Sequence, residues 1–154
     1  MSGLSVSGLH VGIGAVEVLR DVSFQVAPGE IFGLIGESGS GKSMTALALM
    51  DLLPKGSART GTIHLDGTEV SALDERDMRD VRGNDISMIF QEPMTALNPL
   101  QTIGDQVMET VRIHTGASRA DARARAREVL DRVGLPADRF PLTRYPHELS
   151  GGQR

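Results

Sequence analysis

The segment of residues 36–43 restricts the fold of this chain more than any other. It reads Gly-Glu-Ser-Gly-Ser-Gly-Lys-Ser and fits the phosphate-binding pattern G-x-x-x-x-G-K-[ST] without a mismatch. Residues 30–35, just before it, form a short apolar run typical of a buried strand, and residues 44–50, just after it, predict a helix. Strand, glycine loop and helix therefore follow in the order that this loop needs, which indicates an α/β fold with a phosphate site.

Such a loop binds phosphate because its consecutive backbone N–H groups turn toward the polyanion and the following helix adds its positive dipole end. We expect Lys42 to reach the β- and γ-phosphates and the Ser43 hydroxyl to become a ligand of Mg²⁺. A flexible Gly/Ser turn is the alternative, but a full match by chance is expected only about a few thousandths of a time in a chain of this length. The residues predicted to bind the nucleotide here are Gly36, Glu37, Ser38, Gly39, Ser40, Gly41, Lys42 and Ser43.

The composition excludes some partners and leaves others open. The 154 residues are enough for one domain or a little more, and they carry 16 Lys and Arg against 20 Asp and Glu, a formal net charge of -4. Because that balance gives no basic surface, we do not expect nucleic-acid binding. The absence of cysteine excludes disulfides and thiolate metal sites, and it fits a reducing cytosol without requiring one.

The N-terminal stretch, residues 4–19, is mostly uncharged and has two interpretations. A secretory signal would need Lys or Arg before its apolar part, whereas here glycines interrupt the apolar residues, so we favour a pair of strands. No window approaches the roughly 20 apolar residues of a membrane-spanning helix. Association with a membrane would therefore need a partner protein.

Strand patterns dominate the first part of the chain. Alternation predicts strands at residues 22–26 and 60–68, the latter bracketed by the turn glycines Gly61 and Gly67. An apolar run at residues 86–90 predicts another buried strand.

Helical patterns dominate from residue 91 onward, so we expect a nucleotide-binding core with a β subdomain in residues 1–90 and a helical subdomain in residues 91–154. Helices are expected at residues 71–81, 103–113 and 119–133. The apolar face of the last helix consists of Ala122, Ala126, Val129, Leu130 and Val133. Its arginines lie mainly outside this stripe and alternate with acidic residues, so we interpret them as a solvated face rather than a nucleic-acid-binding arm.

Residues 149–153, Leu-Ser-Gly-Gly-Gln, form a second motif. Their local chemistry predicts a helix start, with Ser150 as N-cap and Gln153 as its capping-box partner. Glycine is about 1 kcal/mol worse than alanine in a helix interior, so the pair Gly151 and Gly152 is unusual for the first turn of an ordinary helix. The pair leaves N–H groups and the Ser150 hydroxyl accessible, and we interpret the motif as a second site for an anion such as a terminal phosphate.

Together, these motifs resemble those of ATP-binding cassette (ABC) ATPases. Residues 36–43 look like the Walker A loop and residues 149–153 look like the signature motif. Residues 90–99 resemble the family's Q-loop, with Gln91 as the candidate glutamine, and residues 145–150 are similar to the peptide and nickel importer branch. The resemblance covers essentially the whole chain and implies an α/β fold: a partial P-loop NTPase core with an N-terminal antiparallel β subdomain and a helical subdomain.

The resemblance implies a subunit that couples ATP binding and hydrolysis to transport by membrane permease subunits, with di- or oligopeptides favoured over nickel as cargo. Such a subunit is peripheral and lies at the cytoplasmic face of the inner (plasma) membrane. In the family two ATPase subunits, identical or different, meet head to tail, so the ATP of one would contact Ser150, Gly151, Gly152 and Gln153 of the other. Gln91 would serve catalysis by holding Mg²⁺ or water, beside Ser43 as a metal ligand.

Two departures from the family's pattern change what we expect. Residues 10–14 offer no Phe, Tyr or Trp to stack on adenine, so base affinity should be modest, with a His10 stack as an alternative to an ordinary surface histidine. Only Arg154 follows Gln153, so the Walker B strand with its catalytic carboxylates and the switch histidine are not in this sequence. We therefore expect the 154-residue chain alone to hydrolyse ATP poorly and to expose an unpaired sheet edge.

Three other functions stay open at the level of sequence. A GTPase or small-molecule kinase shares the phosphate loop, but the chain has no Asn-Lys-x-Asp guanine motif and neither class explains residues 149–153. A non-transport ABC ATPase of DNA repair or translation would keep both motifs without a permease, although residues 95–103 resemble importers. A non-enzymatic nucleotide-binding fragment that sequesters partner subunits is the third.

Overall fold

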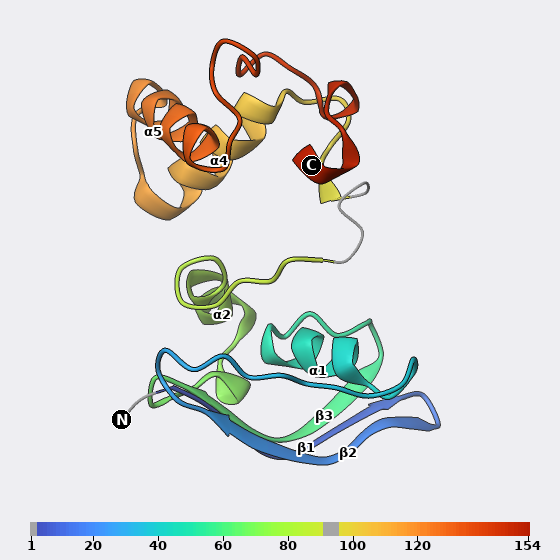
Figure 1. Ribbon diagram of the computed structural model, residues 1–154. Coiled ribbons are helices and arrows are strands. Elements are labelled where there is room, and N and C mark those ends of the chain that lie inside the picture. The colour runs from blue at the N-terminus through green and yellow to red at the C-terminus, as the bar shows by residue number, and fades with distance from the viewer. Residues whose placement is uncertain (1–2, 91–95) are drawn as a thin grey trace. The chain divides into compact units, whose positions relative to one another are not determined.

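The computed structural model describes residues 3–90 and 96–154 (Figure 1). The chain divides into two compact units, Met1–Met88 and Ile89–Arg154. Each unit has a hydrophobic core of its own, so the packing of each can be understood from its own residues.

A four-stranded antiparallel sheet forms the base of the first unit. The strands β1 (Leu4–Ile13) and β2 (Val16–Val26) form a hairpin, and β3 (Ser57–Leu65) pairs with the other side of β1. The short β4 (Thr68–Glu69) pairs with β3, giving the order β2-β1-β3-β4. The strand pair expected for residues 4–19 is thus confirmed, and the expected strand at residues 22–26 is the second half of β2.

The sheet is irregular where Gly8 and Gly61 face each other across β1 and β3. The pairing register shifts between Ser7 and His10, and Gly61 has φ +92, a left-handed conformation that favours glycine. A Cβ at Gly61 would collide with the Gly8 carbonyl oxygen. Gly61 therefore lies inside β3 at a bulge, which corrects the expectation that it brackets the strand as a turn residue.

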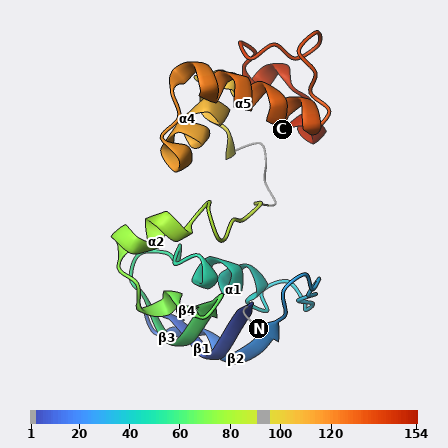
Figure 2. The ribbon, with the colours of Figure 1, turned by 90° about the vertical axis from the view of Figure 1, so that its left-hand side faces the viewer.

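The helix α1 (Lys42–Leu49) lies over one face of this sheet (Figures 1 and 2). The core between them and the following segments consists of Val6, Leu9, Val11, Leu19, Ala48, Ile63, Val70 and Met78. The single helix expected for residues 71–81 is instead a 3₁₀ turn, η1 (Val70–Ala72), followed by α2 (Glu75–Val81). This division follows from Asp74, whose side chain accepts a 2.9 Å hydrogen bond from the Asp77 N–H and begins a new helix.

The buried strands predicted at residues 30–35 and 86–90 do not form, so both predictions are wrong. Within the described residues no strand pairs with residues 30–35, and Ile31 and Ile35 are 99% and 95% exposed. Residues 86–90 contribute only one isolated bridge, between Arg82 and Ile86. An apolar run predicts burial only if neighbouring strands satisfy its backbone and cover its side chains. Among the described residues no strand pairs with these segments, and β2 partly covers Phe32, whose ring stacks on Phe24 with 5.0 Å between the ring centroids.

The second unit packs two helices and the segments that follow them. The helices α4 (Ile103–Thr115) and α5 (Arg119–Arg132) confirm both expected helices to within two residues at each end. The side chains of Thr102 and Ser118 accept the N–H of Asp105 and Asp121 and so cap their first turns. The core is formed by Ile103, Met108, Ala122, Ala126, Leu130, Leu135, Phe140, Leu142 and Leu149.

The apolar stripe expected on α5 is correct in its central residues and wrong at its end. Ala122, Ala126 and Leu130 are buried, whereas Val133 is 66% exposed. Val133 lies just after the helix, where α5 ends and the chain turns at Gly134 (φ +81), so helical spacing no longer determines which way it faces.

Candidate nucleotide-binding site

The residues of the phosphate-binding pattern lie together at the start of α1. Gly41 is the N-cap of the helix, with φ +91, and Lys42 and Ser43 are its first two residues. The Ser40 N–H donates to the Glu37 carbonyl at 3.2 Å, which closes a turn within the loop. The loop is largely exposed, so a ligand could reach it from solvent.

Lys42 folds back over the loop that precedes it. Its Nζ donates to the carbonyl oxygens of Gly36 at 2.8 Å and Glu37 at 2.6 Å, and to the Ser40 Oγ at 3.2 Å. The ammonium group thus lies among the residues of the pattern, as expected for a positive charge that would meet a phosphate group at this loop.

The start of α1 also offers unused hydrogen-bond donors. Among the described residues, no main-chain or side-chain acceptor is found for the N–H groups of Gly41, Lys42 and Ser43. The first N–H groups of any helix lack an intrahelical partner, and here they lie beside a lysine in an exposed glycine loop. A phosphate group would satisfy them, so the loop fits a polyanion.

Two contacts fix Gly41 of this loop, one within the first turn of α1 and one to the sheet, and neither was expected from the sequence. Thr45 is buried, and its hydroxyl and its N–H both donate to the Gly41 carbonyl, at 3.1 and 2.8 Å. Gly41 approaches the Leu19 side chain of β2 so closely that a Cβ would collide with it. The second glycine of the pattern therefore serves packing as well as backbone conformation.

The second motif lies in the second unit. Ser150 has the extended conformation of an N-cap, and Gly151–Gln153 form the 3₁₀ turn η3. The Ser150 N–H donates to the Gln153 Oε1 at 2.9 Å, so the expected contact from the glutamine side chain is present. Leu149 is buried in the core and fixes the motif from one side, while Gly151 and Gly152 are exposed.

Two candidate residues remain, Gln91 and His10. Gln91, the candidate catalytic glutamine and metal ligand, lies outside residues 3–90 and 96–154. His10, the alternative for stacking on adenine, has its Nδ1 3.0 Å from the Glu17 Oε1 at the exposed surface of the hairpin.

The comparison with protein families decides the identity of the chain. The family model for ABC transporters matches residues 19–154, which include both motifs. The chain belongs to the ABC transporter family. The loop at residues 36–43 and the motif at residues 149–153 both lie within the part of the chain that the family model matches.

Individual relatives within the ABC family agree with this assignment. A protein of Brucella abortus whose name assigns it to peptide import is 51% identical over 146 residues, 90% of this chain and 43% of the relative. The glutathione import ATP-binding protein GsiA of Salmonella typhimurium is 48% identical over an alignment that covers 98% of this chain and 26% of the relative. The chain therefore spans less than half the length of these curated relatives.

Solved structures of ABC cassettes share the fold. A dimeric structure of a bacterial ABC transporter cassette aligns with a TM-score of 0.80 at 27% identity, covering 97% of this chain and 64% of that one. A dimeric post-hydrolysis state of an ATP-binding cassette, bound to ADP and Pi, aligns with a TM-score of 0.78 at 27% identity, with the same coverage. The expected α/β cassette fold is thus confirmed. In the part of the chain that the structure describes, no helix has the length and apolarity needed to cross a membrane.

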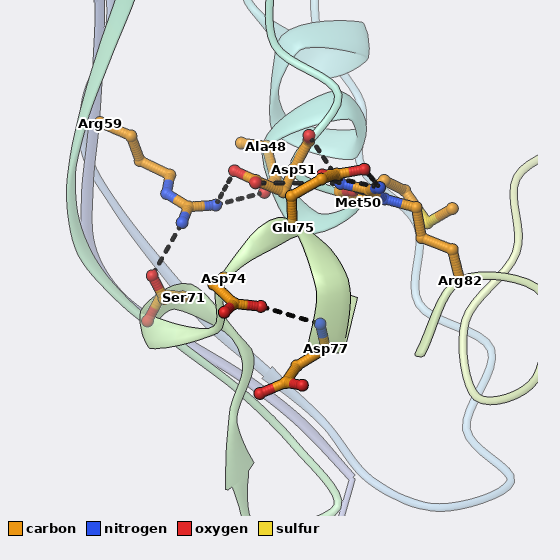
Figure 3. Close-up of polar contacts among 9 residues, drawn as sticks. All are labelled: Ala48, Met50, Asp51, Arg59, Ser71, Asp74, Glu75, Asp77 and Arg82. Atoms are coloured by element: carbon orange, nitrogen blue, oxygen red, sulfur yellow. Dashed lines mark hydrogen bonds and ion pairs between the residues drawn. The ribbon is translucent and has the colours of Figure 1, made fainter. Parts of the chain in front are cut away.

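One cluster in the first unit of this ABC domain was not identified from the sequence. At the far end of α1, Arg59 and Arg82 surround Asp51, which has φ +51 (Figure 3). The Arg82 guanidinium also donates to Glu75, and this hydrogen bond is the main cause that holds the pKa of Glu75 below its usual value. No motif indicates this cluster, because its members lie in β3, in and just after α2, and just after α1, and only folding brings them together.

Proposed function

We propose that this chain supplies the ATP-binding part of an ABC importer subunit that couples ATP binding and hydrolysis to the uptake of di- or oligopeptides. The observation that carries the proposal is the loop at the start of α1. There, N–H donors that have no acceptor within residues 3–90 and 96–154 lie beside the Lys42 ammonium group. The names of the relatives support the class of cargo, since they refer to peptide and glutathione import.

Within this function each part of the loop has a separate task. The N–H groups of Gly41, Lys42 and Ser43 would donate to phosphate oxygens, and Lys42 would exchange its carbonyl partners for the β- and γ-phosphates. The Ser43 hydroxyl would be a ligand of Mg²⁺, which supplies charge neutralisation of the phosphates, and Gln91 is the proposed second ligand or water-binding group. The rest of the phosphate loop is formed by Gly36, Glu37, Ser38, Gly39 and Ser40.

The proposed partners follow from the second motif and from the family. Ser150, Gly151, Gly152 and Gln153 would contact ATP bound by a second ATPase subunit, identical or different, in a head-to-tail dimer, and the exposure of the two glycines fits that role. Membrane permease subunits would hold the dimer at the cytoplasmic face of the inner membrane as a peripheral protein. Residues 1–90 and 91–154 are the proposed nucleotide-binding core and helical subdomain.

Calorimetry with Mg-ATP tests nucleotide binding by the loop. The chain has two lysines, so Lys55→Ala, an exposed residue outside the loop, is a matched control for Lys42→Ala. Removing a charged donor from bound phosphate should weaken binding about 10- to 100-fold, whereas Lys55→Ala should bind like the wild type. Equal affinity of all three proteins, or no binding by the folded wild type, would contradict the proposal.

Uptake of a labelled dipeptide tests the cargo. Cells in which the gene is disrupted should take up less of the peptide, and a copy with Lys42→Ala should not restore the uptake. Unchanged peptide uptake together with loss of another solute would reject peptide as the cargo while leaving nucleotide binding intact.

A further inference from the structure

The end of α1 opposite the phosphate loop is held by two half-buried arginines. Arg59, in β3, donates through Nη1 to the Ala48 carbonyl at 3.0 Å and through Nη2 to the Ser71 carbonyl at 2.9 Å. Arg82, at the end of α2, donates through Nε to the Met50 carbonyl at 2.7 Å and through Nη2 to the Asp51 carbonyl at 3.0 Å. Figure 3 shows the two guanidinium groups approaching this end of the helix from opposite sides, with Asp51 between them.

The chemistry of these contacts suits the end of a helix. The contacted carbonyls are those of Ala48 in the last turn of α1, of the C-cap Met50 and of Asp51 just after it, and the Ala48 carbonyl also accepts the Asp51 N–H at 3.2 Å. This end of the helix carries the negative end of its dipole, so two guanidinium groups that donate to these carbonyls complement the dipole with positive charge. Their side chains are only 16% and 17% exposed, so water competes little for these hydrogen bonds.

Asp51 lies between the two arginines at this end of the helix. It is a non-glycine residue with φ +51, directly after the helix C-cap Met50. Its carboxylate lies 3.1 Å from Arg59 Nη1 and 3.8 Å from Arg82 Nη2. Through these two contacts the Asp51 carboxylate joins both guanidinium groups at the end of α1.

We propose that Arg59 and Arg82 are positioning residues for nucleotide binding, which hold the end of α1 to β3 and α2 and thereby fix the phosphate loop at its start. This inference rests on the proposed function. We call Arg59, Arg82 and the carbonyls of Ala48, Met50 and Asp51 the arginine clamp.

The length of α1 determines how far a change at the arginine clamp displaces the phosphate loop. Its eight residues span about 12 Å, so a tilt of about five degrees at the clamp moves the loop end by about 1 Å. A displacement of that size in a binding or catalytic constellation is enough to lose up to about a hundredfold in function. The helix is too short to hold its position by its own stability, so its packing and end contacts decide where Lys42 and Ser43 lie.

The test compares Arg82→Gln with a matched control, Arg127→Gln in the second unit. The Arg127 guanidinium is also half-buried, and it also contacts two main-chain carbonyls, those of Leu135 and Phe140. It contacts one carboxylate, that of Asp131, where Arg82 contacts two. Both variants therefore lose the same kinds of contacts, but only Arg82→Gln affects α1. Arg59→Gln, which leaves the Arg82 contacts in place, is the second clamp variant.

Two measurements on the 154-residue chain separate positioning from general stability. In amide hydrogen exchange without nucleotide, peptides covering residues 36–47 should exchange faster in Arg82→Gln and Arg59→Gln than in the wild type. In Arg127→Gln they should exchange at the wild-type rate. In calorimetry, where the stoichiometry counts folded molecules, the Mg-ATP dissociation constant should rise about tenfold or more in the clamp variants and stay within about twofold in the control. Arg82→Lys should recover part of the affinity, because an ammonium group keeps the charge and one carbonyl contact.

Failure of this inference differs from failure of the proposed function. If the wild type binds Mg-ATP and the clamp variants bind it equally well at full stoichiometry, or if residues 36–47 exchange as in the wild type, the clamp does not position the loop. If the folded wild type binds no Mg-ATP, the proposed function is wrong, and the exchange of residues 36–47 alone decides whether the clamp holds α1.

Discussion

Gly41 and Gly39 occupy similar backbone conformations in the phosphate loop, but only Gly41 touches the sheet. Their φ angles are +91 and +84, and a Cβ would meet the Leu19 side chain at Gly41 and nothing within 4 Å at Gly39. Gly39→Ala should therefore lose about 1–2 kcal/mol through backbone strain alone. Gly41→Ala should lose about 1–3 kcal/mol more, since Leu19 must also move.

Urea unfolding of the two glycine variants checks this difference. Equal losses would mean that Leu19 accommodates the methyl group at no cost and that packing places no demand on the second glycine of the pattern.

Glu75 makes the stability of the first unit depend on pH in a predictable direction. Its hydrogen bond with Arg82 lowers its pKa from 4.5, so the folded state binds the proton less readily than the unfolded state. The resulting stabilisation is present above the unfolded value and is lost as pH falls through the lowered folded value. It should be small and sensitive to salt, because the Glu75 side chain is 65% exposed.

Thermal unfolding between neutral pH and pH about 3 measures this effect. The difference in melting temperature between the wild type and Glu75→Gln should shrink toward the acid end, and it should be smaller at high ionic strength. In an Arg82→Gln background the same substitution should have almost no pH-dependent effect. A constant difference across the range would show that the pair does not titrate as a unit.

At the scale of elements, Gly104 sets how closely α4 approaches the segment that follows α5. Its N–H donates to the Leu142 carbonyl at 2.9 Å, and a Cβ at residue 104 would lie 2.6 Å from that oxygen. Helix propensity alone predicts that Gly104→Ala stabilises α4 by about 1 kcal/mol. The collision involves main chain that cannot rotate away, so we expect a net loss of about 1–3 kcal/mol instead.

The sign of the Gly104→Ala effect decides between these two expectations. Chemical unfolding should show the loss for Gly104→Ala and almost no change for Glu109→Ala, an exposed residue of the same helix. A gain in stability would mean that α4 and residue 142 separate without cost.

The elements that the sequence predicts well are those whose signals are local. The helices α4 and α5 each have an N-cap residue and an apolar stripe. Each of these signals depends only on residues a few positions apart in the sequence. The loop of residues 36–43 is predicted for the same reason, because its function depends on consecutive residues. In contrast, residues 30–35 were expected to be buried from their composition, and burial depends on which strands lie beside them.

The contacts that hold the site in place are the ones that the sequence does not reveal. The contact of Gly41 with Leu19 joins residues far apart in sequence, and Arg82 lies 32 residues from its acceptor Met50. An arginine in a charged stretch such as residues 75–82 is normally a solvated residue, so neither periodicity nor a motif distinguishes Arg82 from Arg79. The sequence thus predicts what the loop binds, and the structure shows what positions it.

At the scale of the whole molecule, the exposed apolar segment at residues 30–35 predicts how the chain behaves in solution. Ile31 and Ile35 are almost fully exposed, and no strand among the described residues pairs with the segment. Unpaired extended backbone with apolar side chains favours association between copies. The sedimentation coefficient of the 154-residue chain should therefore rise with its concentration.

Lysine substitutions at these two positions separate association from folding. Ile31→Lys/Ile35→Lys should remove the concentration dependence, because two positive charges on an extended segment oppose pairing with a second copy. Its unfolding free energy should change by less than about 0.5 kcal/mol, since exposed side chains away from packed contacts contribute little. Leu100→Lys, at a residue that is 85% exposed in the second unit, is the control and should leave the association unchanged. If Leu100→Lys dissociates the chain equally well, exposed apolar area anywhere on the molecule drives association, and the segment at residues 30–35 has no special role in it.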